Sequence, residues 1–492
     1  MRSRPPAQLT FVPPELPPLL HGLNAWWTPP HEVRPPIPAF RRRQTRTLAE
    51  RLRRRSPLIQ VIRGPRQVGK TTAILQIVEA LLAHGVKPSD ILLLRFDLQT
   101  LRETGGLLGL VGWFESNVRR RPLAEGAPAF LLLDEVHKLP RWNEEVKHLA
   151  ETTPARMVVT GSSSVLVAKG TRESLAGRVL TTEFPPFSFR EVLEAWHPEL
   201  TPPVPPLRFL DTFEDRARRA FLDLHAFGEA NAPALRQALD RFYNRGGYPR
   251  LHSGEVEEDV WADYLVETVF DRVLGVDIPD LFPIQQPQLL RHLYLSVARR
   301  TGQEVSQIEL ATEANTAGLR TNQPTVGRYL HYLADALLVR EFRRFPLARA
   351  KTARVPVKMT LTDLGVRNAI FRGAPSLWES PPDVVGPLVE TMVQAAIRDA
   401  NLAVHFYRER VDPEDRRSPF EEVDFVAERT DGEVLPVEVK FRRRVDDADF
   451  ATVRRFMDKH RCRRGVLVTR ETCALDGDRI LAVPLRDFLL AY

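Results

Sequence analysis

Residues 64–71 form a loop whose residue types and spacing could bind phosphate. Their sequence, GPRQVGKT, fits the pattern G-x-x-x-x-G-K-[ST] and lies between an apolar strand-like stretch (58–62) and an amphipathic helical stretch (71–84). We expect Lys70 to reach the β and γ phosphates of a nucleotide and Thr71 to bind Mg²⁺. A chance glycine loop before a helix is the alternative, which the strand–loop–helix order disfavours. The predicted ATP contacts are Gly64, Pro65, Arg66, Gln67, Val68, Gly69, Lys70, Thr71 and Thr72.

A second strand should bring a carboxylate to this metal. The apolar run 130–133 ends in Asp134 and Glu135. We expect Asp134 to hold Mg²⁺ through water and Glu135 to polarise the attacking water. On the next strand-like stretch, Thr160 leads into Gly161 and the serines 162–164, which would place hydroxyl groups near the γ-phosphate. A serine-rich helix cap is the alternative for this last segment.

An arginine that meets the transition-state charge is the remaining part of such a site. Arg178 in the sequence LAGR is the best placed candidate, acting either in its own site or across a subunit boundary. Arg66 and Arg172 are rivals, and a surface salt bridge is the alternative role for Arg178.

Residues 134–137 also spell the D-E-x-H sequence of superfamily 2 helicases. A helicase of that kind needs a second RecA-like domain with its own arginine motif. The sequence offers no second α/β unit that would serve, so a single nucleotide-binding domain is predicted.

A second group of acidic and basic residues lies in the last third of the chain. Glu438 and Lys440 alternate with Val437 and Val439, so they should share one face of a strand while the valines face the core. Asp424 on the preceding strand could meet Glu438 and hold Mg²⁺, and Lys440 could position the attacking water. Glu390 would be an outer ligand. The pattern resembles the PD-(D/E)XK nuclease motif, and a solvent-facing Glu–Lys pair on an ordinary strand is the alternative.

Between residues 289 and 344 the periodicity predicts three helices, the second around 307–314 and the third over 324–338, followed by a strand over 339–345. This is the order of a winged helix. Small helical bundles without a DNA partner show the same pattern. The residues that could face a DNA groove are Arg320, Asn322, Gln323 and Arg328.

Basic residues crowd two further segments. Residues 41–55 contain many arginines and a single acidic residue, Glu50. This composition is typical either of a helix that contacts phosphate or of a solvated helix face. Arg442, Arg443, Arg444, Arg454 and Arg455 accompany the C-terminal acidic residues. The net charge of +7 favours polyanionic partners without demonstrating one.

The elements that must position these residues suggest five parts. These are a proline-rich arm whose Trp26 and Trp27 pack onto the body (1–40), an ATPase domain (41–200), a helical lid or linker (201–285), a winged-helix-like DNA-binding domain (286–370) and a nuclease-like domain (371–492). The last part has the predicted order αβββαβ.

Composition excludes several classes of protein. The apolar fraction of 43% is that of a folded soluble protein, and no apolar run approaches the roughly 18 residues of a membrane span. The N-terminal stretch has too many prolines for a signal peptide. Two cysteines, Cys462 and Cys473, exclude a zinc ribbon or disulfide framework. A cytoplasmic location is expected.

Several sequence blocks together resemble a prokaryotic family of AAA-superfamily ATPases, whose C-terminal region is known only as a domain of unknown function. They are GPRQVGKTT, LLLDEVHKLPRW, VVTGSSS, SLAGRV and PFSFREVL, followed by residues 246–249, TVGRYLHYLADALLV and residues 362–368. The resemblance covers nearly the whole chain after the arm. It implies an α/β fold class with a P-loop AAA-type core, a helical and winged-helix middle region and a C-terminal restriction-endonuclease-like α/β domain. It also suggests a homo-oligomer, of which a ring is one form.

These features predict an ATP- and Mg²⁺-dependent, DNA-binding ATPase that couples hydrolysis to DNA remodelling or processing. AAA cores followed by winged helices also occur in branch-migration and origin-binding motors, a similarity of architecture only. The rival hypothesis is an ATP-dependent signalling switch or protein-interaction module with an inactive nuclease-like domain.

Overall fold

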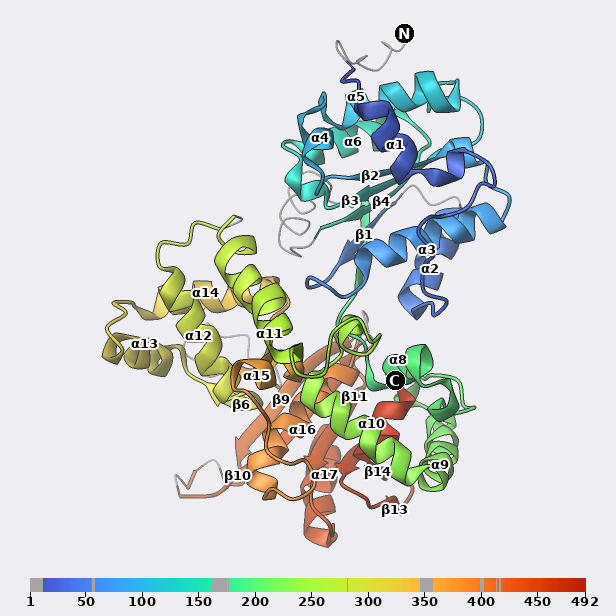
Figure 1. Cartoon of the computed structure of the whole chain (residues 1–492). Helices are drawn as coiled ribbons and strands as arrows, with labels where there is room; N and C mark the ends of the chain where they lie inside the picture. Colours follow the sequence, from blue (N-terminus) through green and yellow to red (C-terminus); the bar gives the residue numbers. More distant parts are fainter. Residues whose placement is uncertain are drawn as a thin grey trace. The chain divides into compact units, whose positions relative to one another are not determined.

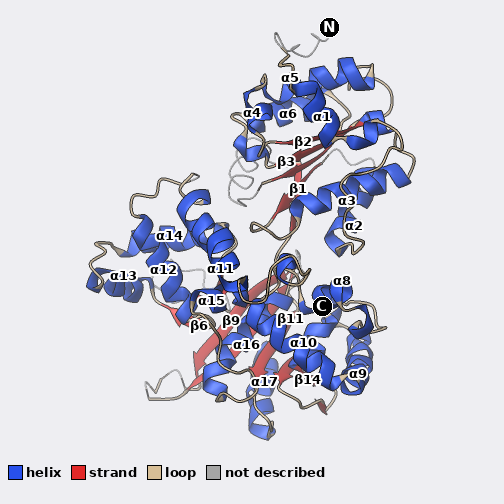
Figure 2. Ribbon diagram, in the orientation of Figure 1, coloured by secondary structure: helices blue, strands red, loops and turns tan. Residues whose placement is uncertain are grey.

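A computed structural model (Figure 1) describes residues 12–54, 58–161, 175, 177–280, 282–345, 357–398, 402–412, 414–415 and 417–492. The chain divides into two compact units, residues 1–185 and 186–492. Both units combine helices with a β-sheet (Figure 2).

The first unit is built on a five-stranded parallel sheet with the order β2-β3-β4-β1-β5. Its inner strands are nearly continuous apolar runs such as FLLLD and RMVVT, because helices cover both faces. The strands are β1 (Ile59–Arg63), β2 (Ile91–Arg95), β3 (Phe130–Asp134), β4 (Arg156–Thr160) and β5 (Val179–Glu183). The α-helices are α1 (Leu16–Leu23), α2 (Arg43–Arg53), α3 (Lys70–Ala83), α4 (Gln99–Glu103), α5 (Gly106–Phe114) and α6 (Trp142–Thr152).

The described part of the N-terminal arm lies on the edge strand β2 and includes helix α1. Indole nitrogens of Trp26 and Trp27 donate to the carbonyl of Ile91 at 3.3 and 2.8 Å. The side chain of Asn24 is fully buried and bonds to both backbone groups of Leu93, accepting from its N–H at 2.7 Å and donating to its carbonyl at 3.0 Å. Asn24 therefore satisfies edge groups of β2 that lack a neighbouring strand.

The second unit is built on a nine-stranded mixed sheet with the order β13-β14-β12-β11-β10-β9-β7-β8-β6. Its strands are β6 (Gln303–Val305), β7 (Val339–Arg344), β8 (Val357–Leu361), β9 (Leu402–Arg410), β10 (Phe420–Arg429), β11 (Val434–Lys440), β12 (Gly465–Thr469), β13 (Ala474–Asp476) and β14 (Ile480–Pro484). Its α-helices are α8 (Phe189–Trp196), α9 (Asp215–Ala230), α10 (Ala232–Arg245), α11 (Trp261–Leu265), α12 (Pro287–Arg299), α13 (Gln307–Thr316), α14 (Gln323–Asp335), α15 (Leu364–Ile370), α16 (Pro382–Ala396), α17 (Asp447–His460) and α18 (Leu485–Ala491).

Residues 287–361 contain three helices, α12, α13 and α14, and the strands β6, β7 and β8. Helix α13 begins after Ser306 and α14 begins after Asn322, whose side chains each accept a hydrogen bond from the helix they precede. Strand β7 pairs with β8 and also with β9, at Arg343 and Arg344. This segment therefore shares one continuous sheet with the C-terminal strands.

The C-terminal part has the order α16-β9-β10-β11-α17-β12, followed by β13, β14 and α18. Strands β9, β10 and β11 are antiparallel neighbours, and β12 is parallel to β11. Helices α16 and α18 share a core with Phe425, Val437 and Val466, whereas α17 shares a second core with Val426 and Leu467. Alternate residues of the strands thus enter two cores, one on each face.

Candidate functional site

The phosphate-binding loop of the first unit connects β1 to α3. Gly69 adopts a left-handed conformation with φ of 89°. Gly64 packs so closely that a Cβ atom there would lie 2.2 Å from the carbonyl oxygen of Phe184. Only glycine fits both demands. The Nζ of Lys70 is buried at the start of α3 and donates to the carbonyls of Gly64 and Pro65 at 2.9 and 2.8 Å.

Strand β3 brings its terminal carboxylate directly to this loop. The hydroxyl of Thr71 donates to Oδ2 of Asp134 at 2.8 Å, and the hydroxyl of Thr160 donates to Oδ1 of the same carboxylate. Burial raises the pKa of Asp134, and the neighbouring Glu135 carboxylate raises it further, whereas the two hydroxyls and Lys70 lower it. A hydroxyl and a buried carboxylate in contact are a donor set that suits Mg²⁺, because the ion would offset the unfavourable burial of charge.

Glu135 stands at the turn after β3 with φ of 54°. Its backbone N–H donates to the hydroxyl of Thr160 at 3.2 Å, and Oε2 of its carboxylate lies 3.6 Å from Nε2 of His137. A positive φ is a strained conformation for a residue with a side chain, so the backbone leaves the regular strand geometry at Glu135, at the carboxyl edge of the sheet. Residues 162–164 and Arg172 lie outside the described residues.

Arg178 is not brought to the loop of its own chain. It immediately precedes β5, and its carbonyl accepts from the N–H of Ile59 at the first residue of β1. The phosphate-binding loop follows the opposite end of β1, about 15 Å away for a five-residue strand. The guanidinium of Arg178 is half exposed and forms an ion pair with Glu151 at 2.9 Å. A role for Arg178 within its own site is therefore contradicted, and a role across a subunit boundary remains a prediction.

The arginine-rich segment before β1 is used partly for packing. Arg42 is buried and donates to the carbonyl of Pro185 at 2.8 Å, and Arg51 reaches the hydroxyl of Thr182 at 3.4 Å. Arg43 and Arg46 are exposed on α2. The segment is thus a helix with both buried and solvated arginines.

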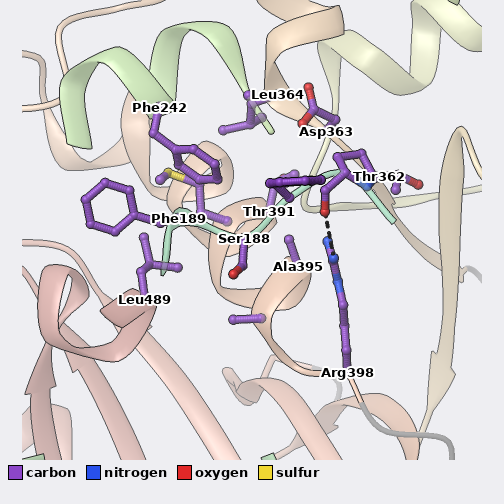
Figure 3. Close-up of a pocket in the computed structure, with 15 residues that line it drawn as sticks. Ser188, Phe189, Phe242, Thr362, Asp363, Leu364, Thr391, Ala395, Arg398 and Leu489 are labelled. Atoms are coloured by element: carbon purple, nitrogen blue, oxygen red, sulfur yellow. Dashed lines mark hydrogen bonds between the residues drawn. The ribbon is translucent and has the colours of Figure 1, made fainter. Parts of the chain in front are cut away.

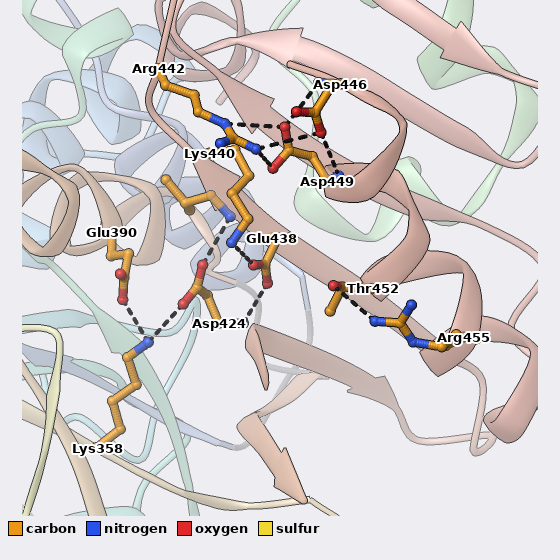
Figure 4. A network of polar contacts seen from close by, with 11 residues as sticks. Lys358, Glu390, Asp424, Glu438, Lys440, Arg442, Asp446, Asp449, Thr452 and Arg455 are labelled. Carbon is orange, nitrogen blue, oxygen red and sulfur yellow. Dashed lines mark hydrogen bonds and ion pairs between the residues drawn. The ribbon is translucent and has the colours of Figure 1, made fainter. Parts of the chain in front are cut away.

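The acidic group of the second unit is brought together as the alternation predicts, with one addition (Figure 4). A β-bulge between Val423 and Val426 interrupts the pairing of β10 with β9 and contains Asp424. The Nζ of Lys440 donates to Oε1 of Glu438, and Oε2 of Glu438 accepts from the backbone N–H of Asp424 at 3.1 Å.

The addition is Lys358 on β8, which the sequence analysis did not identify. Its Nζ lies 2.5 Å from Oε2 of Glu390 and 3.1 Å from Oδ1 of Asp424. Burial raises the pKa of Glu390 and of Glu438, and the Asp424 carboxylate raises both further. The signal that could have found Lys358 is a lysine within the short strand-like stretch VKMTL, whose last four residues are all buried in the structure.

The residues predicted to face DNA lie at the start of α14 and in the turn before it. Arg320 and Arg328 are exposed, and Nη2 of Arg328 is 3.4 Å from the hydroxyl of Thr325. The Oδ1 of Asn322 accepts from the N–H of Thr325 at 3.0 Å, so this side chain caps the helix. Gln323 is partly buried as the first residue of α14. The two arginines are the freer candidates for contact with phosphate.

A small apolar pocket in the second unit lies among α8, α10, α16 and α18 (Figure 3). At its polar end, Oδ2 of Asp363 accepts from the N–H of Gly247 at 2.7 Å, and Arg398 donates to the carbonyl of Pro186 at 3.2 Å. Burial raises the pKa of Asp363 to about 6. Residues 246–249 and 362–368, two of the blocks that carry the family resemblance, therefore contact each other beside this pocket.

Family models match three separate parts of the chain. The family model described as an AAA domain matches residues 56–193. This part of the chain is therefore similar to AAA-type P-loop ATPase domains. Two further models, both described as domains of unknown function (DUF8612 and DUF4143), match residues 236–376 and 385–488.

Relatives are distant. An uncharacterized protein of Haemophilus influenzae is 20% identical over 63% of this chain and 68% of its own length. An uncharacterized protein of Mycobacterium tuberculosis is 25% identical over 71% of this chain and 66% of its own. The chain therefore spans about two thirds of the length of these curated relatives.

Two solved structures share a weak overall similarity with this chain. The Walker-type ATPase PABY2304 of Pyrococcus abyssi is 15% identical, with a TM-score of 0.37 over 69% of this chain and 99% of that one. The ORC1 protein of Aeropyrum pernix, solved in complex with DNA, is 17% identical, with a TM-score of 0.26 over 71% of this chain and 96% of that one.

Among the described residues, no helix has the length and apolar character needed to span a membrane.

Proposed function

We propose that this chain is a Mg²⁺-dependent ATPase that binds DNA and couples ATP hydrolysis to DNA remodelling or processing. The contact of the Thr71 hydroxyl with the Asp134 carboxylate, 2.8 Å apart beside the loop that holds Lys70, carries the catalytic part of the proposal. Bound Mg²⁺ would neutralise charge on the phosphates, held by Thr71 directly and by Asp134 through water.

The chain's own residues would then change partners when nucleotide binds. The ammonium of Lys70 would leave the carbonyls of Gly64 and Pro65 for the phosphate oxygens, which are stronger, charged acceptors. Glu135 would orient the attacking water. Thr160 would keep the carboxylate of Asp134 aimed at the metal by the hydrogen bond that it already donates.

DNA binding is proposed for residues 286–370. The order of α12, α13 and α14 with three short strands supports a winged helix, and Arg320 in the turn before α14 and Arg328 in the second turn of α14 are both exposed. Two exposed cations on this helix and on the turn before it are suited to phosphate contact. Because Asn322 already caps α14, its side chain is proposed to position the helix and not to read a base.

A homo-oligomer is part of the same proposal. Arg178 lies at the edge of the sheet opposite the loop, so it can stabilise transition-state charge only in a neighbouring copy. A cytoplasmic location and the five-part division of the chain remain our proposals as well.

A signalling switch or interaction module is the second candidate. The observation that favours it is the lysine within the C-terminal acidic group, because a filled cation position is unsuited to metal-dependent cleavage. In that case the second unit would bind a partner other than DNA.

A salt titration of DNA binding separates the two candidates. Fluorescence anisotropy with duplex, branched and single-stranded DNA should show salt-sensitive binding, and ATPase turnover should rise with at least one of them. Arg320→Ala/Arg328→Ala should reduce the slope of log K against log salt by about 2, one for each lost phosphate contact. The matched control Arg218→Ala/Arg219→Ala removes two exposed arginines from α9 and should leave the slope unchanged. Absence of binding and of stimulation would favour the switch.

A further inference from the structure

The acidic group of the second unit contains a cation supplied by the chain itself. Lys358 is 7% exposed, and its ammonium lies between Glu390 of α16 and Asp424 of β10. Its Nζ also lies 5.1 Å from the centre of the Phe425 ring, whose face attracts a cation. Figure 4 shows the ammonium between these two carboxylates.

The carboxylate oxygens of Asp424 and Glu438, which a metal would need, already accept hydrogen bonds from the protein. Oδ1 of Asp424 is paired with Lys358, and Oδ2 accepts from the N–H of Val439 at 2.9 Å. Oε1 of Glu438 accepts from Lys440, and Oε2 accepts from the N–H of Asp424. Mg²⁺ demands near-octahedral oxygen ligands. Among the described residues, no group of three or more His, Cys, Asp or Glu side chains is arranged to hold a metal ion.

Electrostatics oppose a metal at this place as well. Two ammonium groups, of Lys358 and Lys440, already face the three carboxylates of Glu390, Asp424 and Glu438. A divalent cation added between them would be repelled by the nearby buried ammonium of Lys358, and this repulsion is weakly screened away from water. The residues present therefore do not fit the Mg²⁺ that the nuclease motif implies.

We propose that Lys358 takes the position of the divalent cation, so that the acidic group is an ionic joint that links β8 to α16 and β10 and not a metal-dependent nuclease centre. The proposal concerns this group alone and depends neither on DNA binding nor on ATP hydrolysis.

Further contacts show that the joint is extensive. Glu304 of β6 pairs with Arg408 of β9 at 3.1 Å, and the hydroxyls of Thr301 and Thr391 lie 2.9 Å apart. Strand β7 pairs with β9 beside them. The described residues between 287 and 361 are thereby bound to the C-terminal strands, and Lys358 is a buried part of their contact.

Metal stoichiometry tests the proposal on the intact chain. Mn²⁺ binding without nucleotide is measured by calorimetry for the wild type and for Glu438→Gln. We expect the two proteins to bind the same number of ions, because the group takes none. One ion fewer in Glu438→Gln, or Mn²⁺-dependent nicking of DNA that is lost in Lys440→Ala, would overturn the proposal.

A gain-of-binding variant gives the converse test. Lys358→Met keeps the length of the side chain and removes its charge, so an additional Mn²⁺ should bind and should be lost again in Lys358→Met/Glu438→Gln. The matched control Lys459→Met removes a lysine that pairs with Glu409 on the surface, and it should gain nothing. No additional ion in a folded Lys358→Met would contradict the proposal. If that variant fails to fold, the comparison of the wild type with Glu438→Gln still decides.

Discussion

At the scale of single residues, the charged groups of the P-loop site all have protein partners. Lys70 is held by two backbone carbonyls, and Asp134 by two hydroxyls. These partners are neutral, whereas phosphate and Mg²⁺ carry charges opposite to those of Lys70 and Asp134, so bound nucleotide and metal would replace ion–dipole contacts with contacts between opposite charges. The side chains of the proposed site thus already lie together, and nucleotide binding would exchange their partners without forming a new helix or strand.

Glu135→Gln tests the role given to the second acid of this site. The variant should still bind ATP, because Glu135 is not expected to touch phosphate, but hydrolysis should fall by about 10²- to 10⁴-fold through loss of the group that polarises water. Steady-state turnover and the affinity for a fluorescent ATP analogue measure the two effects separately. Glu144→Gln, at an exposed position on α6, is the control and should behave as wild type. Unchanged turnover in Glu135→Gln would remove this residue from the mechanism.

At the scale of elements, edge strand β2 depends on a side chain for part of its hydrogen bonding. Asn24 presents both a donor and an acceptor to Leu93, as a neighbouring strand would. The indoles of Trp26 and Trp27 add two bonds to Ile91, and Trp27 stacks on Phe114 with ring centres 5.7 Å apart. The arm therefore completes the sheet of the first unit instead of lying loosely on it.

Asn24→Ala should lower the free energy of unfolding of the first unit by about 2 kcal/mol, because it leaves a buried N–H and a buried carbonyl without partners. Chemical denaturation followed by tryptophan fluorescence measures the change. Asn117→Ala removes an exposed asparagine whose amide donates to the carbonyl of Trp113 in the preceding helical turn, and should change stability by less than about 0.5 kcal/mol. Equal effects of the two substitutions would show that β2 does not need the arm.

At the scale of the whole molecule, the placement of Arg178 bears on assembly. Within one chain it pairs with Glu151 at the edge of the sheet opposite the loop. An arginine that stabilises the transition state typically contributes about 10³-fold or more to turnover. If Arg178 makes this contribution, it must make it to the site of another copy.

Mixing two inactive variants tests this arrangement. Lys70→Ala should lack turnover because its own loop fails, and Arg178→Ala because it cannot serve its neighbour. In a mixed oligomer, the intact loop of an Arg178→Ala subunit can meet the intact arginine of a Lys70→Ala subunit, so part of the ATPase activity should return. Full activity of Arg178→Ala alone, or no recovery on mixing, would refute the role across a subunit boundary.

The sequence by itself determined the features that contiguous residues encode. The order strand, glycine loop, Lys70 and Thr71 specifies a phosphate-binding loop, because each part is local and acts through its own backbone geometry. Asp134 at the end of an apolar run and the alternation of Glu438 with Lys440 were predictable for the same reason. The three helices between residues 289 and 344 followed from periodicity in the same way.

Only the tertiary structure decided which distant residues meet. The sequence could not place Arg178 at the far edge of the sheet, because that depends on the parallel register of β5 with β1. Nor could it bring Lys358 into the acidic group, since β8 reaches that group through the pairing of β7 with both β8 and β9. A sequence motif identifies residues that could bind a cation. Whether a metal ion or a lysine ammonium lies between those residues depends on which other side chains the fold packs against them.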